Sequence, residues 1–167
     1  MPRSFNFSLQ SAATVEQIHS AFSREDYWLT RLTSFGAAGR LESLTVEPDG
    51  RVIAVAVHDL RPDGLPQAIA KFFPRQWRVV QTEIWKPTGD GRVRGKVSVV
   101  THGAPGSGTG RVTLAPTRHG SQLKGTGTVE FRVPLVGGQI EKVMGRGLVQ
   151  NMSVLQDFTA QWINEHT

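Results

Sequence analysis

Polar and apolar residues alternate in the first segment of the chain. Phe5, Phe7 and Leu9 fall on one side of residues 3–11, and the positions between them are polar. Alternation with a period of two predicts a half-buried β-strand. The next segment, Thr14-Val-Glu-Gln17, has the form of a capping box and should start a helix. We expect two short helices between this strand and the glycine-containing stretch at residues 36–39.

From residue 41 the period-two pattern returns, and turn residues interrupt it at intervals. The expected strands cover residues 41–47, 51–59, 76–86, 92–102, 109–115 and 122–133. Most connections have hairpin length, as at Pro48-Asp49-Gly50, so neighbouring strands should pair antiparallel. One longer connection holds a short apolar helical piece at residues 65–73, and residues 103–108 are expected to form a loop.

The last three of these strands have one apolar face and one polar face. Valine, leucine and phenylalanine recur at alternate positions, and threonine, lysine and arginine lie between them. The apolar face also contains four glycines, Gly95, Gly110, Gly125 and Gly127. Glycine is unfavourable inside a strand. Two compatible explanations stay open: the glycines let the sheet bend sharply, or their missing side chains leave room for a ligand.

Helical spacing returns over residues 135–165. At 100° per residue, one broad face contains Val136, Ile140, Val143, Met144, Gly147, Asn151, Val154, Leu155, Phe158 and Trp162. Outside this face fall Lys142, Arg146, Val149, Gln150 and Asp157. A helix is only about 10 Å wide, so a single helix cannot fill a strongly curved sheet. The remaining space is either packed by large side chains or left for a ligand.

The composition is that of one soluble globular domain. The chain has 167 residues, of which 38% are hydrophobic and 20% charged, as expected for a single domain over residues 1–167. Its longest apolar run, residues 52–57, is far shorter than the roughly 20 residues of a membrane-spanning helix. The absence of cysteine excludes disulfides, thiolate metal sites and cysteine nucleophiles. Because the N-terminus has no apolar signal segment, we expect a cytoplasmic protein.

Short motifs give no support for nucleotide, metal or hydrolase chemistry. Gly106-Ser-Gly-Thr-Gly110 is similar to a phosphate-binding loop, but a strand pattern follows it where a dinucleotide site needs a helix. The five histidines are scattered and lack the spacing of paired metal ligands. The sequence has no Gly-x-Ser-x-Gly elbow. We therefore expect no metal and no cofactor.

Glu83 is the most informative polar residue, because its strand fits two phases. One phase turns inward Trp77, Val79, Gln81, Glu83 and Trp85. The other turns Val80, Thr82 and Ile84 inward and leaves Glu83 in solvent. A buried carboxylate in an aromatic setting could act as an acid, a base or a ligand anchor. Asn151, at the centre of the helix face, could contact a ligand or make a structural hydrogen bond.

The chain is basic, with a formal net charge of +5 at pH 7 and a pI of about 10.2. Cationic side chains occupy the polar face of the sheet at Arg92, Arg94, Lys96, Arg111, Lys124 and Arg132. A solvated face is the ordinary explanation, and docking on an anionic membrane surface or an acidic partner is the sharper one. Nucleic acid is not an expected partner, because no recognised binding motif accompanies the charge.

The order of one strand, two short helices, six strands and a long helix resembles the START/birch-pollen-allergen-like superfamily of helix-grip proteins. It also resembles an uncharacterised actinobacterial family within that superfamily. Segments such as Thr82-Glu-Ile-Trp85 are similar to segments of that family, but they do not identify a chemical activity. The resemblance spans essentially the whole chain and implies a cavity that binds lipids, polyketides, hormones or other apolar molecules. Some relatives are cyclases, aromatases or hydroxylase components, but no catalytic motif of theirs matches this chain.

We therefore expect an α+β helix-grip fold with a curved antiparallel seven-stranded sheet, two short helices after strand 1 and a long C-terminal helix. The expected function is binding or transport of a hydrophobic small molecule between this helix and the sheet, without catalysis. The alternatives are a cyclase- or aromatase-like enzyme and a module that docks through its basic face. We expect a monomer or a weak dimer. The expected ligand contacts are Trp77, Glu83, Trp85, Val97, Val99, Val112, Val129, Phe131, Ile140, Met144, Asn151, Leu155 and Phe158.

Overall fold

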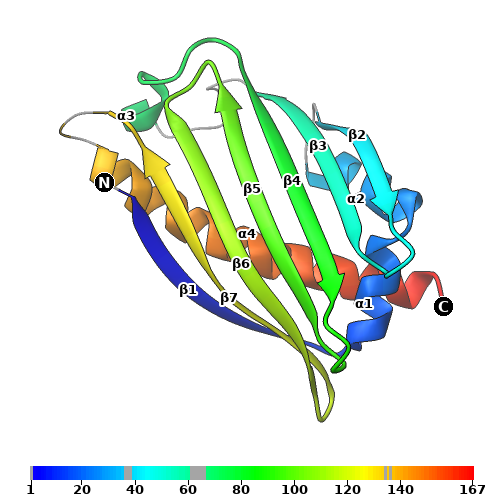
Figure 1. Ribbon diagram of the computed structural model, residues 1–167. Helices are drawn as coiled ribbons and strands as arrows, with labels where there is room; N and C mark the ends of the chain where they lie inside the picture. The colour runs from blue at the N-terminus through cyan, green and yellow to red at the C-terminus, as the bar shows by residue number, and fades with distance from the viewer. Residues whose placement is uncertain (1, 36–38, 61–66, 134, 136) are drawn as a thin grey trace.

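The structure is a computed structural model that describes residues 2–35, 39–60, 67–133, 135 and 137–167. Its elements are β1 (Arg3–Ser11), α1 (Val15–Phe22), α2 (Glu25–Phe35), β2 (Gly39–Val46), β3 (Val52–Leu60), α3 (Gln67–Ala70), β4 (Trp77–Pro87), β5 (Val93–His102), β6 (Gly106–Thr117), β7 (Gly120–Phe131) and α4 (Gly137–Glu165). The described residues form one seven-stranded antiparallel sheet, with a long C-terminal helix across it (Figure 1). The predicted fold class is therefore confirmed.

The sheet has the order β1-β7-β6-β5-β4-β3-β2. Strands β2 to β7 follow one another as a meander, while β1 pairs with the far edge, where Phe7 lies opposite Gly125. The capping box predicted at the start of α1 is present: the Gln17 backbone N–H donates to the Thr14 hydroxyl (3.1 Å), and the Thr14 N–H donates to the Gln17 side chain (2.9 Å). Part of the glycine break, part of the 65–73 piece and Val136 lie outside the described residues.

Strand β6 begins earlier than the sequence pattern predicted. Residues 106–108, expected to belong to a loop, pair with Phe131, Glu130 and Val129 of β7. The loop prediction was wrong there because glycine has no side chain that could display the alternation, although its backbone still pairs. This longer β6 matters for function, since it brings Gly108 as well as Gly110 onto the inner face of the sheet.

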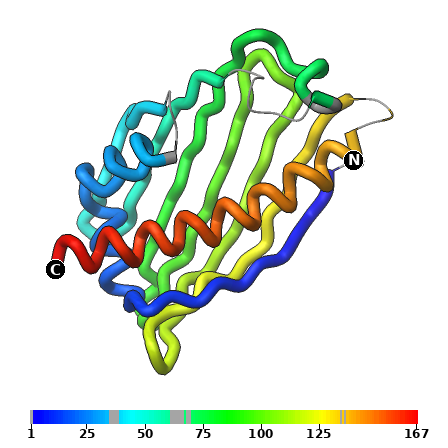
Figure 2. The backbone as a smooth tube through the Cα atoms, turned by 180° about the vertical axis from the view of Figure 1, so that it is seen from behind, coloured from blue at the N-terminus to red at the C-terminus, as the bar shows by residue number. Residues whose placement is uncertain are grey.

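Helix α4 has 29 residues and is therefore about 44 Å long. It crosses the concave side of the sheet diagonally, while α1 and α2 lie at its C-terminal end (Figure 2). The helix packs mainly along β1 and β7. Strands β3 to β5 are therefore not covered by α4 along their length, and the concave side of the sheet is left partly open.

The buried face of α4 is rotated from the predicted one. Val143 and Val154, which the spacing placed toward the sheet, are 47% and 50% exposed. Buried positions instead include Glu141, Gln156 and Thr159. The spacing misled because it counted only apolar residues, whereas polar residues also occupy the buried face. Glu141, for example, accepts a hydrogen bond from the backbone N–H of Phe131 (2.8 Å) and so ties the start of α4 to β7.

The apolar core forms two clusters. The larger one joins α1, α2 and the C-terminal end of α4 to the sheet, and it is rich in aromatic rings such as Phe22, Trp28 and Trp85. The smaller one, around Phe131 and Ile140, lies near the N-terminal end of α4. None of the described helices is long and apolar enough to cross a membrane. The larger cluster forms one wall of a cavity between the sheet and the helices.

Candidate functional site

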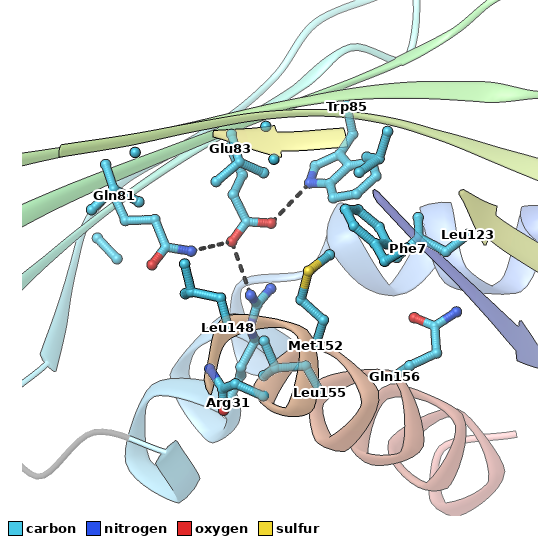
Figure 3. Close-up of a pocket in the computed structure, with 18 of the residues that line it drawn as sticks. Phe7, Arg31, Gln81, Glu83, Trp85, Leu123, Leu148, Met152, Leu155 and Gln156 are labelled. Atoms are coloured by element: carbon cyan, nitrogen blue, oxygen red, sulfur yellow. Dashed lines mark hydrogen bonds and ion pairs between the residues drawn. The ribbon is translucent and has the colours of Figure 1, made fainter. Parts of the chain in front are cut away.

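A cavity of about 280 Å³ lies between the concave face of the sheet and helices α2 and α4. Figure 3 shows its walls, with Phe7, Trp85 and Leu123 on one side and Leu148, Met152 and Leu155 of α4 on the other. Its lining is mostly apolar. Its size is at the lower end of small-molecule sites, which span roughly 300–1,000 Å³. The geometry is that of a partly open pocket for one small apolar compound.

The glycines of the inner sheet face have different roles. A Cβ atom at Gly110 would make only ordinary contacts, the nearest being 3.8 Å from the Thr126 carbonyl oxygen. A Cβ at Gly95 would lie 2.4 Å from the Trp85 ring, and one at Gly127 would lie 2.4 Å from the Phe5 ring. These two glycines therefore make room for aromatic rings, whereas Gly110 lines the cavity and has room for a Cβ atom.

The remaining two inner glycines complete this division. A Cβ at Gly125 would lie 2.2 Å from the Arg111 carbonyl oxygen, so β6 and β7 approach there more closely than a side chain allows. A Cβ at Gly108 would have its nearest contact at 3.5 Å. Both explanations offered by the sequence therefore hold, but at different positions. Close packing accounts for Gly95, Gly125 and Gly127, and cavity space accounts for Gly108 and Gly110.

Glu83 points into the cavity, which resolves the choice between the two phases of β4. It pairs across the sheet with Ala54 and Val97 and is only 4% exposed. Among the described residues its carboxylate accepts three hydrogen bonds (Figure 3). The donors are Nη2 of Arg31 at 2.9 Å, Nε2 of Gln81 at 2.7 Å and Nε1 of Trp85 at 3.1 Å. The carboxylate is thus held in one orientation.

Arg31 reaches Glu83 from α2 and is the cationic member of the site. Its side chain is 12% exposed, and the guanidinium carbon lies 4.8 Å from the centre of the Trp28 ring, a cation–π arrangement. Burial opposes the charge, but the attraction of Glu83 outweighs it and raises the pKa of Arg31 above its usual value. The result is a fixed ion pair, the Arg31–Glu83 pair, at the wall of an apolar cavity.

Two further titratable residues line the cavity. The Tyr27 hydroxyl lies 2.7 Å from the Thr159 hydroxyl, which itself donates to the Leu155 carbonyl (2.8 Å), so Tyr27 is the donor. Burial raises the pKa of Tyr27, although Arg31 counteracts this in part. The pKa of His58 is lowered, first by burial and then by the charge of Arg31. Both residues are therefore biased toward their uncharged forms at neutral pH.

One buried amide on the α4 side of the cavity is incompletely paired. Gln156 is 8% exposed, and its Nε2 atom has no hydrogen-bond partner within the described part of the chain. Figure 3 places it beyond Met152, away from the Arg31–Glu83 pair. A buried polar group without a partner usually indicates a water or a ligand. It is therefore a second polar point inside the same cavity.

The structure brings together most of the predicted ligand contacts. The cavity lining includes Glu83, Trp85, Val97, Val99, Val112, Val129, Asn151 and Leu155. The others lie elsewhere: Phe131, Ile140 and Met144 belong to the smaller core cluster, Trp77 stacks near Phe73, and Phe158 packs against Tyr27.

Sequence reasoning missed Arg31, His58, Gln156 and Thr159 as cavity residues. Arg31 was the one with a usable signal, because it follows Tyr27 by four positions and Trp28 by three. Residues at these spacings share one face of a helix. Arginine is almost never buried unless it is paired, so an arginine on such a face indicates an acidic partner.

The basic residues predicted on the polar side lie outside the cavity. Arg94, Lys96, Arg111 and Lys124 are exposed. Nη1 of Arg92 lies 3.6 Å from a carboxylate oxygen of Asp90, and Nη1 of Arg132 lies 3.9 Å from one of Glu130.

No group of three or more potential metal ligands occurs among the residues that the structure describes.

The chain has the helix-grip fold that the sequence predicted, and solved structures share this fold. Ara h 8.0201 aligns with a TM-score of 0.60 at 12% identity and covers 99% of each chain. Norcoclaurine synthase from Thalictrum flavum, solved with dopamine and hydroxybenzaldehyde, aligns with a TM-score of 0.55 at 16% identity, over 100% of this chain and 89% of its own. At such identities the likeness shows the fold alone.

The chain belongs to the family described as protein of unknown function DUF2505, whose model matches residues 6–163. Uncharacterised proteins of Mycobacterium tuberculosis and Mycobacterium bovis are 30% identical to it over 173 residues. The alignment covers 99% of this chain and 99% of each relative. These relatives are actinobacterial, as the resemblance implied.

Proposed function

We propose that this protein binds a small apolar molecule in the cavity between α4, α2 and the concave face of the sheet. The observation that carries the proposal is the pair of strand glycines, Gly108 and Gly110, which line the cavity although a Cβ atom would fit at each of them. An unfilled apolar volume weakens a fold, by about 24 cal/mol per Å³ in measured cases. The empty cavity therefore lowers the stability of the fold, and a bound apolar ligand would offset this loss by filling the space.

The lining supports the same proposal. Half-buried Val97 and Val99 on β5 face α4 across the cavity, and Leu155 of α4 closes the opposite side. Small-molecule sites typically combine such apolar walls with a few fixed polar groups that orient the ligand. Here the Arg31–Glu83 pair supplies the fixed polar groups. The apolar walls provide affinity, and the pair provides orientation.

A cyclase-like enzyme is the second candidate, because Tyr27, His58 and Glu83 all line the same cavity. Acid–base catalysis needs a group that can exchange a proton with the substrate. Glu83 is engaged by three donors among the described residues, and Tyr27 already donates to Thr159. Tyr27 would have to break this contact before it could transfer a proton, and a proton on Glu83 would remove its ion pair with Arg31. The arrangement therefore favours binding over catalysis.

Native mass spectrometry of the protein purified from its own host tests the proposal. The wild-type chain should carry a small-molecule adduct that organic extraction removes. The variant Gly110→Val, which places methyl groups in the cavity, should carry much less of it. The matched control Thr113→Val changes the outer face of the same strand and should retain the adduct. An adduct of equal abundance on all three chains, or on none of them, would contradict cavity binding.

A further inference from the structure

We propose that the cavity selects an uncharged, hydroxyl-bearing ring compound, of the phenol or cyclic alcohol class, whose hydroxyl binds between Glu83 and Arg31. This inference rests on the proposed function and specifies the chemistry of the ligand. It predicts discrimination between compounds that share a ring system but differ in the charge of the head group.

The Arg31–Glu83 pair has unused hydrogen-bonding capacity. A carboxylate has about four lone-pair sites. In the described structure Oε2 of Glu83 accepts from Arg31 and Gln81, whereas Oε1 accepts only from Trp85. An arginine has five N–H donors. In the described structure Arg31 donates from Nη2 to Glu83 and also interacts with the Tyr27 hydroxyl, which leaves further N–H groups for a ligand. A hydroxyl can donate to Oε1 and accept from the guanidinium, so it can satisfy both partners at once.

The net charge of the cavity wall is a second constraint on the ligand. Arg31 and Glu83 neutralise each other, and their pairing leaves no net charge at the cavity wall. Burial and the nearby Arg31 lower the pKa of His58, so His58 adds no charge above pH 7. A ligand carboxylate would bring a second negative charge beside Glu83 in a medium of low polarity, where like charges repel strongly. A ligand ammonium would meet Arg31 in the same way. The pair therefore favours a neutral head group.

The size and shape of the cavity are a third constraint on the ligand. An engineered apolar cavity of about 150 Å³ binds benzene, so a cavity of about 280 Å³ holds one or two rings. Aromatic side chains form its inner wall, including Phe7, Phe22 and Trp85, and the Phe22 and Trp85 rings lie 4.7 Å apart. Aromatic walls pack favourably against flat rings in tilted or offset arrangements. A one- or two-ring compound with a single hydroxyl fits these limits.

The probes that test the inference are 2-naphthol, 2-naphthoate and naphthalene, which share one ring system. Their affinities for the full chain can be measured at pH 7.5 by NMR titration. The wild-type protein should bind 2-naphthol at least tenfold more tightly than 2-naphthoate and more tightly than naphthalene. The variant Glu83→Gln keeps the cation but removes its partner, so 2-naphthoate should become the preferred ligand. The control Glu42→Gln makes the same charge change on the exposed part of β2 and should leave the wild-type order unchanged.

A second variant keeps the test decisive if Glu83→Gln does not fold. The double variant Arg31→Met/Glu83→Met removes both charges, so naphthalene should bind it as well as 2-naphthol does. The inference is overturned, while the proposed function stands, if the wild-type chain binds 2-naphthoate as tightly as 2-naphthol or shows no advantage of 2-naphthol over naphthalene. Failure of all three probes also overturns it. The proposed function then falls only if the host-purified protein carries no cavity adduct either.

Discussion

Filling the cavity from the sheet side should stabilise the protein while abolishing ligand binding. In Gly110→Val the new Cβ makes contacts no closer than 3.8 Å, and its methyl groups extend into the cavity. Burying three carbon atoms at about 0.8 kcal/mol each contributes roughly 2 kcal/mol. Replacing a glycine inside a strand adds about 0.5–1 kcal/mol. Together these contributions amount to about 3 kcal/mol, which for a chain of this size raises the Tm by roughly 6–12 °C.

The matched comparison is Gly95→Val, on the same face of the neighbouring strand. There the new Cβ would lie 2.4 Å from the Trp85 ring and 2.5 Å from a methyl group of Val112, so the side chain overpacks the core. Overpacking typically costs about 1–3 kcal/mol. Urea unfolding followed by tryptophan fluorescence measures both variants, and NMR titration measures their affinity for 2-naphthol. The same substitution should therefore have opposite signs at the two glycines.

Two outcomes would refute this reasoning. If Gly110→Val destabilises the protein as much as Gly95→Val does, no usable space exists beside Gly110. If Gly110→Val is more stable than the wild type but retains its affinity for 2-naphthol, the ligand binds elsewhere. The expected loss of affinity is at least tenfold, which corresponds to about 1.4 kcal/mol.

Three further predictions concern the polar groups of the cavity. Glu83→Leu should lower the free energy of unfolding in urea by about 3–5 kcal/mol, because it leaves Arg31 buried without its partner. The double variant Arg31→Met/Glu83→Leu should recover part of this loss but not all of it, because Gln81 and Trp85 still lack their acceptor. Equal losses in the two variants would show that Arg31 and Glu83 are not coupled. The folded-state pKa of His58 lies below its usual value of 6.5. The contribution of neutral His58 to folding stability should therefore be fully present above pH 6.5 and be lost as the pH falls below this value. His58→Asn should flatten this part of the pH–stability curve. Thr159→Val removes the acceptor of the Tyr27 hydroxyl and should cost about 1–3 kcal/mol by thermal unfolding, while an unchanged Tm would mean that the Tyr27 hydroxyl finds another partner.

The order of elements could be read from the sequence because each segment has a clear period. The facing of β4 could not, since apolar residues occupy both of its faces, with Val79 on one and Val80 on the other. Only the register with Ala54 and Val97, which depends on the neighbouring strands, turns Glu83 inward. Strand pairing is a property of the whole sheet, so a single strand cannot reveal it.

The composition of the site depended on contacts between distant segments. Arg31 and Glu83 are 52 positions apart, and neither residue indicates the other without the fold. On α4, hydrophobic spacing identified Ile140 and Trp162 but missed Thr159, which is buried and hydrogen-bonded to Tyr27, far away in the sequence. The glycines were noticed from the sequence, but separating Gly110 from Gly95 required the position of the Trp85 ring. Local pattern therefore predicted the elements, and tertiary contacts determined the site.

Methyl NMR of the wild-type chain during titration with 2-naphthol tests the central claim most directly. If the ligand enters the cavity, the methyl resonances of Val97, Val112 and Leu155, which line it, should shift in proportion to occupancy. Those of Val80 and Val100, at the opposite positions of the same sheet, should stay unchanged. Shifts confined to Val80 and Val100, or no shifts at saturating 2-naphthol, would contradict a binding cavity between the helix and the sheet.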